Sequence, residues 1–249
     1  MCVAALAWHA PPRWRLVAIG NRDEYHQRPA APLARWDDGS GIIAGRDLVG
    51  GGGWLGVNEA GRFVLITNRR GFGDPDPARR SRGELVVAML AGEGPPTQLY
   101  AYNPFNLFAI GGDSLEYLTN RPGSLRTTLG HGVYGLSNGV LDEPWPKTLA
   151  LKSAVTDWLN GAGEDTSALL TILASEDRPA LGLPPGEPSE IPVEPRDTPP
   201  FIRGAVYGTR CSTVVTVDAD GAGRIIERRF DAAGSATGDT ALDFRWPPA

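Results

Sequence analysis

The second residue of the chain, Cys2, is the first candidate for chemistry. Removal of Met1, which is efficient when the next residue is small, would leave a residue that carries both a thiol and a free α-amine. An α-amine has a pKa of about 7.7 to 8.0, so part of it is neutral near pH 7 and can accept a proton from the thiol. Cys2 would then combine nucleophile and base without a histidine.

Cys2 also fits a second interpretation, that of a small apolar residue in a buried strand. Activation of a thiol depends on its surroundings, so other residues must decide between the two. The segment Gly20-Asn-Arg-Asp-Glu24 follows a second predicted strand, at the point where a hairpin would return beside residue 2. It brings an amide, an arginine and two acids to that place, which favours the chemical interpretation.

The elements that must position these residues are mostly strands. Alternation, apolar runs and turn residues predict strands over residues 2–8, 13–20, 54–58, 62–67, 107–110, 115–119, 132–137, 212–217 and 224–230. Three helices are predicted between them. The first begins at the capping-box pattern of residues 81–84, the second runs from Pro146 to Gly161, and the third begins at Thr166 or Ser167.

Strands at both ends of the chain, with helices between them, predict an α+β fold in which helices cover the outer faces of packed sheets. The proline-rich stretch 179–200 is expected to be a long loop, because too little chain follows it to fold alone. We therefore expect a single domain over residues 1–249.

Composition narrows the function classes. The net charge of −5 gives no field that would favour nucleic acid. No apolar run approaches the roughly 20 residues needed to cross a membrane, and the N-terminus has no basic leader, so we expect a cytoplasmic protein without membrane insertion. The two cysteines, Cys2 and Cys211, are expected to be thiols, with Cys211 buried in a strand. Three isolated histidines predict no metal site.

Several ordered motifs resemble the NRDE family, also called the transport and Golgi organization family. They are Met1-Cys2 with Trp8, Asn21-Arg-Asp-Glu24, Gly51-Gly-Gly-Trp-Leu-Gly-Val-Asn58, Thr67-Asn-Arg69, Gly135-Leu-Ser-Asn138 and Tyr207-Gly-Thr-Arg210. That family is similar to the N-terminal-nucleophile (Ntn) cysteine hydrolases of the choloylglycine hydrolase type. The resemblance implies a four-layer αββα sandwich.

The resemblance also implies roles for individual residues. Cys2 matches the nucleophile, Asp23 the residue that orients the α-amine, and Arg210 a cation near the thiol. Asn68 matches a backbone donor to an oxyanion, and Asn138 a side-chain donor. Each such donor contributes about 3 kcal/mol in comparable sites.

One position departs from the hydrolases. They place an arginine three residues before the aspartate, where this chain has Gly20, and Arg22 is the candidate replacement. Both offsets are odd, so in an extended strand either arginine would face away from Asp23. The residues expected to bind substrate are Asn21, Arg22, Glu24, Trp8, Trp54 and Arg69.

Other features leave alternatives open. Trp8, Trp36 and Trp54 fit an apolar pocket near Cys2 or ordinary core packing. The glycines at 50–53 favour a tight turn. The arginines between residues 69 and 82 fit a carboxylate or phosphate site, or a solvated loop.

Two functions follow as hypotheses. The first is hydrolysis of an amide, ester or thioester of an apolar acyl group by Cys2, with no cofactor required. The second, implied by the resemblance, is non-catalytic binding and trafficking of haem or of lipid and acyl-CoA species on the same fold. Both predict a small amphipathic or acyl ligand as the partner, with haem a candidate bound ligand.

Overall fold

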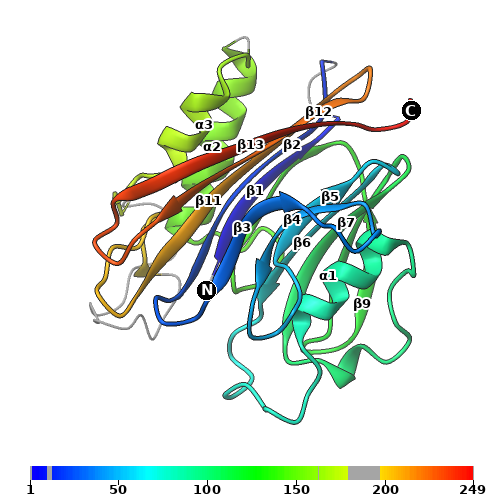
Figure 1. Cartoon of the computed structure of the whole chain (residues 1–249), viewed down its shortest axis with the longest axis vertical. Coiled ribbons are helices and arrows are strands. Elements are labelled where there is room, and N and C mark those ends of the chain that lie inside the picture. The colour runs from blue at the N-terminus through cyan, green and yellow to red at the C-terminus, as the bar shows by residue number, and fades with distance from the viewer. Residues whose placement is uncertain (1, 10–12, 162, 179–196, 249) are drawn as a thin grey trace.

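Two antiparallel sheets stack face to face in the computed structural model (Figure 1), which describes residues 2–9, 13–161, 163–178 and 197–248. The first sheet has the strand order β10-β1-β2-β11-β12-β13. Its strands are β1 (Cys2–Trp8), β2 (Trp14–Tyr25), β10 (Gly132–Leu136), β11 (Tyr207–Asp218), β12 (Ala222–Phe230) and β13 (Ala236–Arg245).

The second sheet follows the chain order β3-β4-β5-β6-β7-β8-β9. Its strands are β3 (Ala30–Arg35), β4 (Ile42–Asp47), β5 (Leu55–Asn58), β6 (Arg62–Asn68), β7 (Phe105–Gly111), β8 (Ser114–Thr119) and β9 (Leu125–Leu129). A short 3₁₀ turn, Leu99–Ala101, precedes β7.

Helices cover the outer faces of both sheets. Helices α2 (Pro146–Asn160) and α3 (Thr166–Leu173) pack on the first sheet, whereas α1 (Arg82–Ala91) packs on β4, β5 and β6 of the second (Figure 1). The layer order is helix, sheet, sheet, helix. The expected α+β fold and αββα sandwich are therefore confirmed.

Strand β1 lies between the two cores of the molecule, which explains its continuous apolar sequence. Alternate side chains of a strand point to opposite faces. Ala4 and Leu6 accordingly pack between the sheets, whereas Val3 and Ala5 pack against α2 and α3. A strand that is covered on both faces needs apolar residues at every position, and it holds its first residue, Cys2, in a fixed place.

The structure corrects several sequence expectations. Strands β3, β4, β9 and β13 were not predicted, and Asn21–Glu24 continues β2 instead of following it. Asp165 caps α3, where Thr166 or Ser167 was expected. The turn predicted at residues 9–12 and the loop at 179–200 fall largely outside the described residues, although β1 and β2 do pair as antiparallel neighbours.

Candidate functional site

Cys2 is the first residue of β1 and faces the space between the sheets. It pairs with Arg22 of β2, and Arg22 pairs on its other side with Cys211 of β11. Directly opposed residues of an antiparallel pair project to the same face. Cys2, Arg22 and Cys211 therefore form a row across three strands, and Cys2 is 8% exposed at its end.

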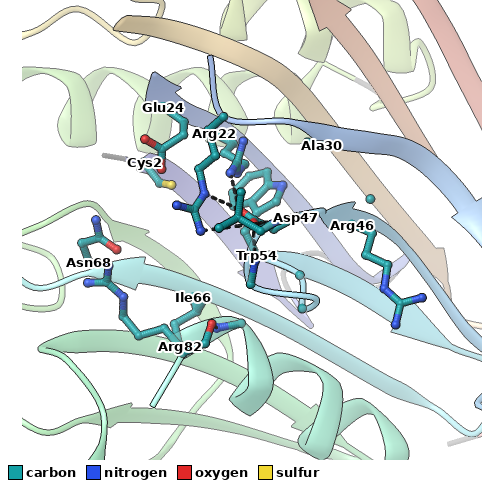
Figure 2. A pocket seen from close by; sticks show the side chains of 18 of the residues that line it. Cys2, Arg22, Glu24, Ala30, Arg46, Asp47, Trp54, Ile66, Asn68 and Arg82 are labelled. Atoms are coloured by element: carbon teal, nitrogen blue, oxygen red, sulfur yellow. Dashed lines mark hydrogen bonds and ion pairs between the residues drawn. The ribbon is translucent and has the colours of Figure 1, made fainter. Parts of the chain in front are cut away.

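This row borders a cavity of about 560 Å³. The cavity is lined by Cys2, by the turn at residues 49–53, by the first turn of α1 and by residues of β11 and β12. Figure 2 shows the Cys2 sulfur, the Arg22 guanidinium and the Asn68 side chain around it, with Arg22 linked to Asp47. The lining includes eight arginines and five acidic residues as well as the Trp54 ring, so charged groups surround the cavity. An apolar pocket, one of the two interpretations of the tryptophans, therefore does not describe it.

Arg22 occupies the face on which the arginine missing at position 20 would lie, because two residues along a strand return to the same face. A Cβ at Gly20 would lie 3.2 Å from the Trp54 ring, so Trp54 fills the place of a longer side chain there. The Arg22 Nη2 atom donates to Asp47 Oδ2 at 2.9 Å. Its Nη1 atom is buried and has no hydrogen-bond partner among the described residues.

Asp47 joins two arginines at the cavity wall. It accepts from Arg22 and also from Arg28, whose Nε lies 2.7 Å from Oδ2. Although burial raises the pKa of Asp47, the hydrogen bonds from Arg28 and from the Gly50 N–H hold that pKa below its ordinary value. The carboxylate thus fixes both cations while remaining charged.

Asp23 points to the opposite face of β2, as the odd offset predicted. Its Oδ1 atom accepts from Thr209 Oγ1 at 2.7 Å, and Thr209 in turn accepts from the Ile202 N–H at 2.9 Å. Burial raises the pKa of Asp23 to about 6, an effect that Lys147 and Thr209 oppose. Asp23 is therefore a buried carboxyl whose charged form depends on these partners.

Burial also raises the pKa of the Cys2 thiol above its ordinary value. The charge of Arg22 and the Asp23 N–H, which donates to the thiol, act in the opposite direction. Because the protonated form still dominates at neutral pH, Cys2 needs a proton acceptor before it can act as a nucleophile.

The two asparagines predicted as oxyanion donors lie together but in different settings. Asn68 lines the cavity, whereas Asn138 is fully buried and donates from Nδ2 to the Asn68 carbonyl at 2.8 Å. The neighbouring Ser137 hydroxyl donates to the Cys2 carbonyl at 2.8 Å. The segment 137–138 thus connects the start of β1 to the end of β6 through hydrogen bonds.

The Asn68 N–H has a direction that suits a donor. Ile66 N donates to Trp54 O at 2.8 Å, across the edge where β5 begins. Amide directions alternate along a strand, so the Asn68 N–H points to the same edge, beyond the start of β5 and toward the cavity.

Glu24, Trp54 and Arg210 also line the cavity, together with Asp23. Arg210 is the extra residue of a β-bulge in β11 opposite β2. Bulges redirect side chains, and the Arg210 guanidinium donates to the carbonyls of Tyr25 at 2.8 Å and Arg28 at 3.0 Å. These contacts leave its charge without a carboxylate partner among the described residues.

Three predicted substrate-binding residues lie outside the cavity lining. Asn21 is fully buried on the helix side of β2 and donates to the carbonyls of Leu173 and Pro200, both at 2.8 Å. Trp8 is core packing at the far end of β1. Arg69 is turned toward Glu143, at 3.8 Å, and Phe72. Asn21 faces away from Cys2 because side chains alternate along β2, and Trp8 lies at the other end of β1. A short sequence motif shows neither feature.

Trp36 does not line the cavity either. Its ring lies under Arg46, and its Nε1 donates to the Ala44 carbonyl at 3.1 Å. The histidines are less isolated than expected, because the rings of His9 and His131 stack at 4.7 Å. Among the described residues, no group of three or more His, Cys, Asp or Glu side chains is arranged to hold a metal ion.

Sequence reasoning missed several charged residues of the site. Arg28 lies in the turn after β2 and Asp47 at the end of β4, neither of which was recognised, and Glu227 lies in the predicted strand 224–230 but was not singled out. Lys147 was placed in a helix, but nothing in its sequence context signals that it is fully buried. The arginines Arg79, Arg80 and Arg82 do line the cavity, but Arg79 pairs with Asp76 at 3.5 Å and Arg80 with Glu84 at 2.9 Å. The ligand interpretation is therefore favoured for Arg82.

Glu227 lines the cavity, and replacing it tests whether its negative charge stabilises the fold. It is 4% exposed, it accepts from the Leu33 N–H at 2.9 Å, and burial raises its pKa. A carboxyl whose pKa is raised by folding stabilises the fold below its ordinary pKa and loses that contribution as pH rises through the folded value. Glu227→Gln is therefore expected to unfold like the wild type at pH 4 and to be more stable than it at pH 7.

Urea unfolding at a series of pH values between 4 and 8 measures this difference. Glu93→Gln, an exposed site beyond α1, is the matched control and should show no such pH-dependent gain. A Glu227→Gln variant that loses stability at pH 7 would mean that the charge, and not only the hydrogen bond to Leu33, holds the wall.

The stacked sheets between helical layers, with a cysteine at the start of an inner strand beside a cavity, define the class of the protein as a four-layer αββα sandwich. The chain belongs to the Transport and Golgi organisation 2 family, whose model matches residues 1–232. The family suggested by the ordered motifs is thereby confirmed.

Similar proteins occur in mammals. The Transport and Golgi organization protein 2 homologs of Bos taurus and Homo sapiens are each 31% identical over 242 residues, covering 86% of this chain and 86% of theirs. Among solved structures, a Caenorhabditis elegans N-acylethanolamine-hydrolyzing acid amidase (NAAA) ortholog aligns with a TM-score of 0.48 and 11% identity, over 86% of this chain and 92% of that one. In the described part of the chain, no helix combines the length and apolar character needed to span a membrane.

Proposed function

We propose that the chain, once Met1 is removed, is an Ntn hydrolase in which Cys2 cleaves an amide, ester or thioester of an acyl substrate. The observation that carries this proposal is the position of Cys2. Its side chain borders a cavity of about 560 Å³ at the end of a buried strand, with Arg22 beside it and Asp23 behind it. Cys211 also borders the cavity, but it lies within β11 and has no α-amine to accept its proton.

The proposed reaction begins with transfer of the thiol proton to the α-amine of Cys2, after which the thiolate attacks the acyl carbon. The oxyanion that forms would accept hydrogen bonds from the Asn68 N–H and from the free Nη1 of Arg22. Asn138 donates to the Asn68 carbonyl and would thereby fix the orientation of the Asn68 backbone, including its N–H. The leaving group takes the proton from the amine, and water then hydrolyses the thioester on Cys2.

Asp23 supports the same chemistry from the other face of β2. Cys2 pairs with Arg22, so Asp23 lies just beyond the start of β1, where the α-amine of a chain that begins at Cys2 would be. Its carboxylate would orient that amine, in the way that the third member of a catalytic triad orients a base.

A specific feature of the cavity favours a second candidate function. Arg82, Arg210 and Arg229 line it, and none of the three forms an ion pair with a carboxylate of the described residues. Each donates to a backbone carbonyl instead: Arg82 to Pro104, Arg210 to Tyr25 and Arg229 to Ala30. Such cations suit an anionic amphipathic ligand, and haem and acyl-CoA are candidates for binding without turnover.

Intact mass of the purified protein, before and after incubation with p-nitrophenyl butyrate, tests the primary proposal. We expect loss of Met1 and one butyryl adduct that maps to Cys2 by peptide mass. Cys211 is an internal control, because it is buried in the same wall and should remain unmodified. Retained Met1, or an adduct on Cys211 alone, contradicts the hydrolase. Ligand binding that persists in Cys2→Ala then supports the second function.

A further inference from the structure

Lys147 is the second residue of α2 and has no exposed surface. Lysine is almost never fully buried unless its charge is paired, because removing an ammonium from water is costly. The N-terminal end of a helix adds to that cost, since the helix dipole is positive there. Helix formation and core packing therefore give no reason for a lysine at this position.

The surroundings of Lys147 supply a reason. Its Nζ atom donates to Thr198 Oγ1 at 2.8 Å, and its charge interacts with Asp23, Cys2 and Asp197. Burial lowers the pKa of Lys147 to about 8, and Asp23 acts against that effect. At each of these two groups the charge of the other opposes the effect of burial, so Asp23 and Lys147 favour each other's charged forms.

Lys147 does not line the cavity. It lies on the helix side of the first sheet, whereas Cys2 faces the space between the sheets. Thr198, which accepts from Lys147, belongs to the segment 197–202, and the Ile202 N–H of that segment donates to Thr209, the hydrogen-bond partner of Asp23. A substrate in the cavity would therefore meet the thiol and not the ammonium group. Any effect of Lys147 on the reaction must act through the charges of Asp23 and Cys2.

A carboxylate beside an amine favours the ammonium form, which cannot accept a proton. Asp23 alone would thus orient the α-amine of Cys2 and at the same time weaken it as a base. A positive charge close by has the opposite effect, because it lowers the proton affinity of every group around it. The same charge also favours the thiolate.

The geometry points to Lys147 as a positioning residue that keeps the α-amine of Cys2 in its neutral, proton-accepting form by placing a buried positive charge behind Asp23. This role rests on the proposed function of Cys2 as an N-terminal nucleophile. It assigns Asp23 and Lys147 opposite tasks: Asp23 holds the amine in place, and Lys147 counters the stabilisation of the ammonium form that the Asp23 carboxylate causes.

The other charged and titratable groups around Cys2 come from three elements. Arg22 and Asp23 lie on β2, Tyr207 and Cys211 on β11, and Arg82 on α1. All of them are retained when Lys147 alone is replaced. A change in the pH response of a Lys147 variant therefore reports the charge of Lys147 itself.

The test is the rate of Cys2 acylation by p-nitrophenyl butyrate between pH 5 and 10 in Lys147→Met, a change that keeps the chain length and removes the charge. We expect the acidic limb of the profile to move up by about one pH unit, with a loss of roughly tenfold at pH 7 and recovery at high pH. Lys152→Met is the matched control, on the same helix but paired with Asp142 at 2.6 Å, and it should keep the wild-type profile.

The outcomes separate this role from the proposed function. An adduct on Cys2 with an unchanged pH profile in Lys147→Met overturns the role of Lys147 only. Absence of an adduct in the wild type at every pH overturns the hydrolase, and the role of Lys147 with it. A lower rate at every pH without a shift indicates a merely structural lysine.

A second measurement covers the case in which Lys147→Met does not fold. In the wild type, acylation should reach half its maximal rate near or below pH 8, the ordinary range of an α-amine, despite the adjacent carboxylate. If acylation reached half its maximal rate only above pH 9, the effect of Asp23 on the α-amine would outweigh that of Lys147. This result would overturn the inference without any variant.

Discussion

Replacing Cys2 with alanine is expected to lower the hydrolysis of p-nitrophenyl butyrate by at least about 1,000-fold, because the nucleophile and its acyl intermediate are lost together. The fold should persist, since alanine is tolerated in a fully buried strand whose neighbours include Ala4 and Ala5. Steady-state turnover measures the loss, and near-ultraviolet circular dichroism checks the packing.

Cys211→Ala is the matched control for this result. Cys211 lies in the same row of side chains, one strand beyond Arg22, and it also borders the cavity. Burial raises the pKa of its thiol well above the ordinary value, so it should contribute little to acyl transfer. If hydrolysis fell equally in the two variants, or fell further in Cys211→Ala, Cys2 would not be the specific nucleophile. That result would contradict the proposed mechanism.

Gly52→Ala is expected to cost about 2 to 3 kcal/mol of folding stability or more. A Cβ at residue 52 would meet the backbone of Gly83 in the first turn of α1, with the carbonyl carbon 2.3 Å and the carbonyl oxygen 2.4 Å away. Backbone atoms cannot rotate aside as a side chain can. Either the turn at residues 50–53 or the start of α1 must shift, and both line the cavity.

Thermal and urea unfolding measure this cost. Gly111→Ala at the end of β7 is the control, because a Cβ there meets no atom within 4 Å. If the two variants were equally stable, the close approach of the turn to α1 would not be part of the native packing. The glycine run thus serves a tight turn, as expected from the sequence, and also a close contact that the sequence does not reveal.

The sequence was informative where a residue's neighbours along the chain decide its environment. The buried strand at Cys2, the start of α2 at Pro146 and the hairpin of β11 and β12 all follow from local patterns. The opposite orientations of Arg22 and Asp23 followed from alternation alone. Ordered motifs identified the family, and four of the five residues matched to the hydrolase site, Asn138 being the exception, border one cavity.

The sequence was uninformative where partners distant in the chain decide. Strands β9 and β13 carry mostly exposed residues, and hydrogen bonds to neighbouring strands define them. Asn21 lies within the motif Asn21–Glu24 yet bonds to Leu173 and Pro200, about 150 residues or more away. In the sequence, Lys147 looks like a solvent-exposed helical lysine. The packing of α2 on β1 is what buries it.

The separation of Lys147 from the cavity has a consequence for how this protein can diversify. Cys2 faces the cavity on one side of the first sheet, while the Asp23 carboxyl and Lys147 lie on the other. Substitutions in α2 could then adapt the acidity at which the protein works without reshaping the surface that selects its ligand. Relatives in compartments of different acidity could keep one ligand preference, and relatives with different ligands could share one pH optimum.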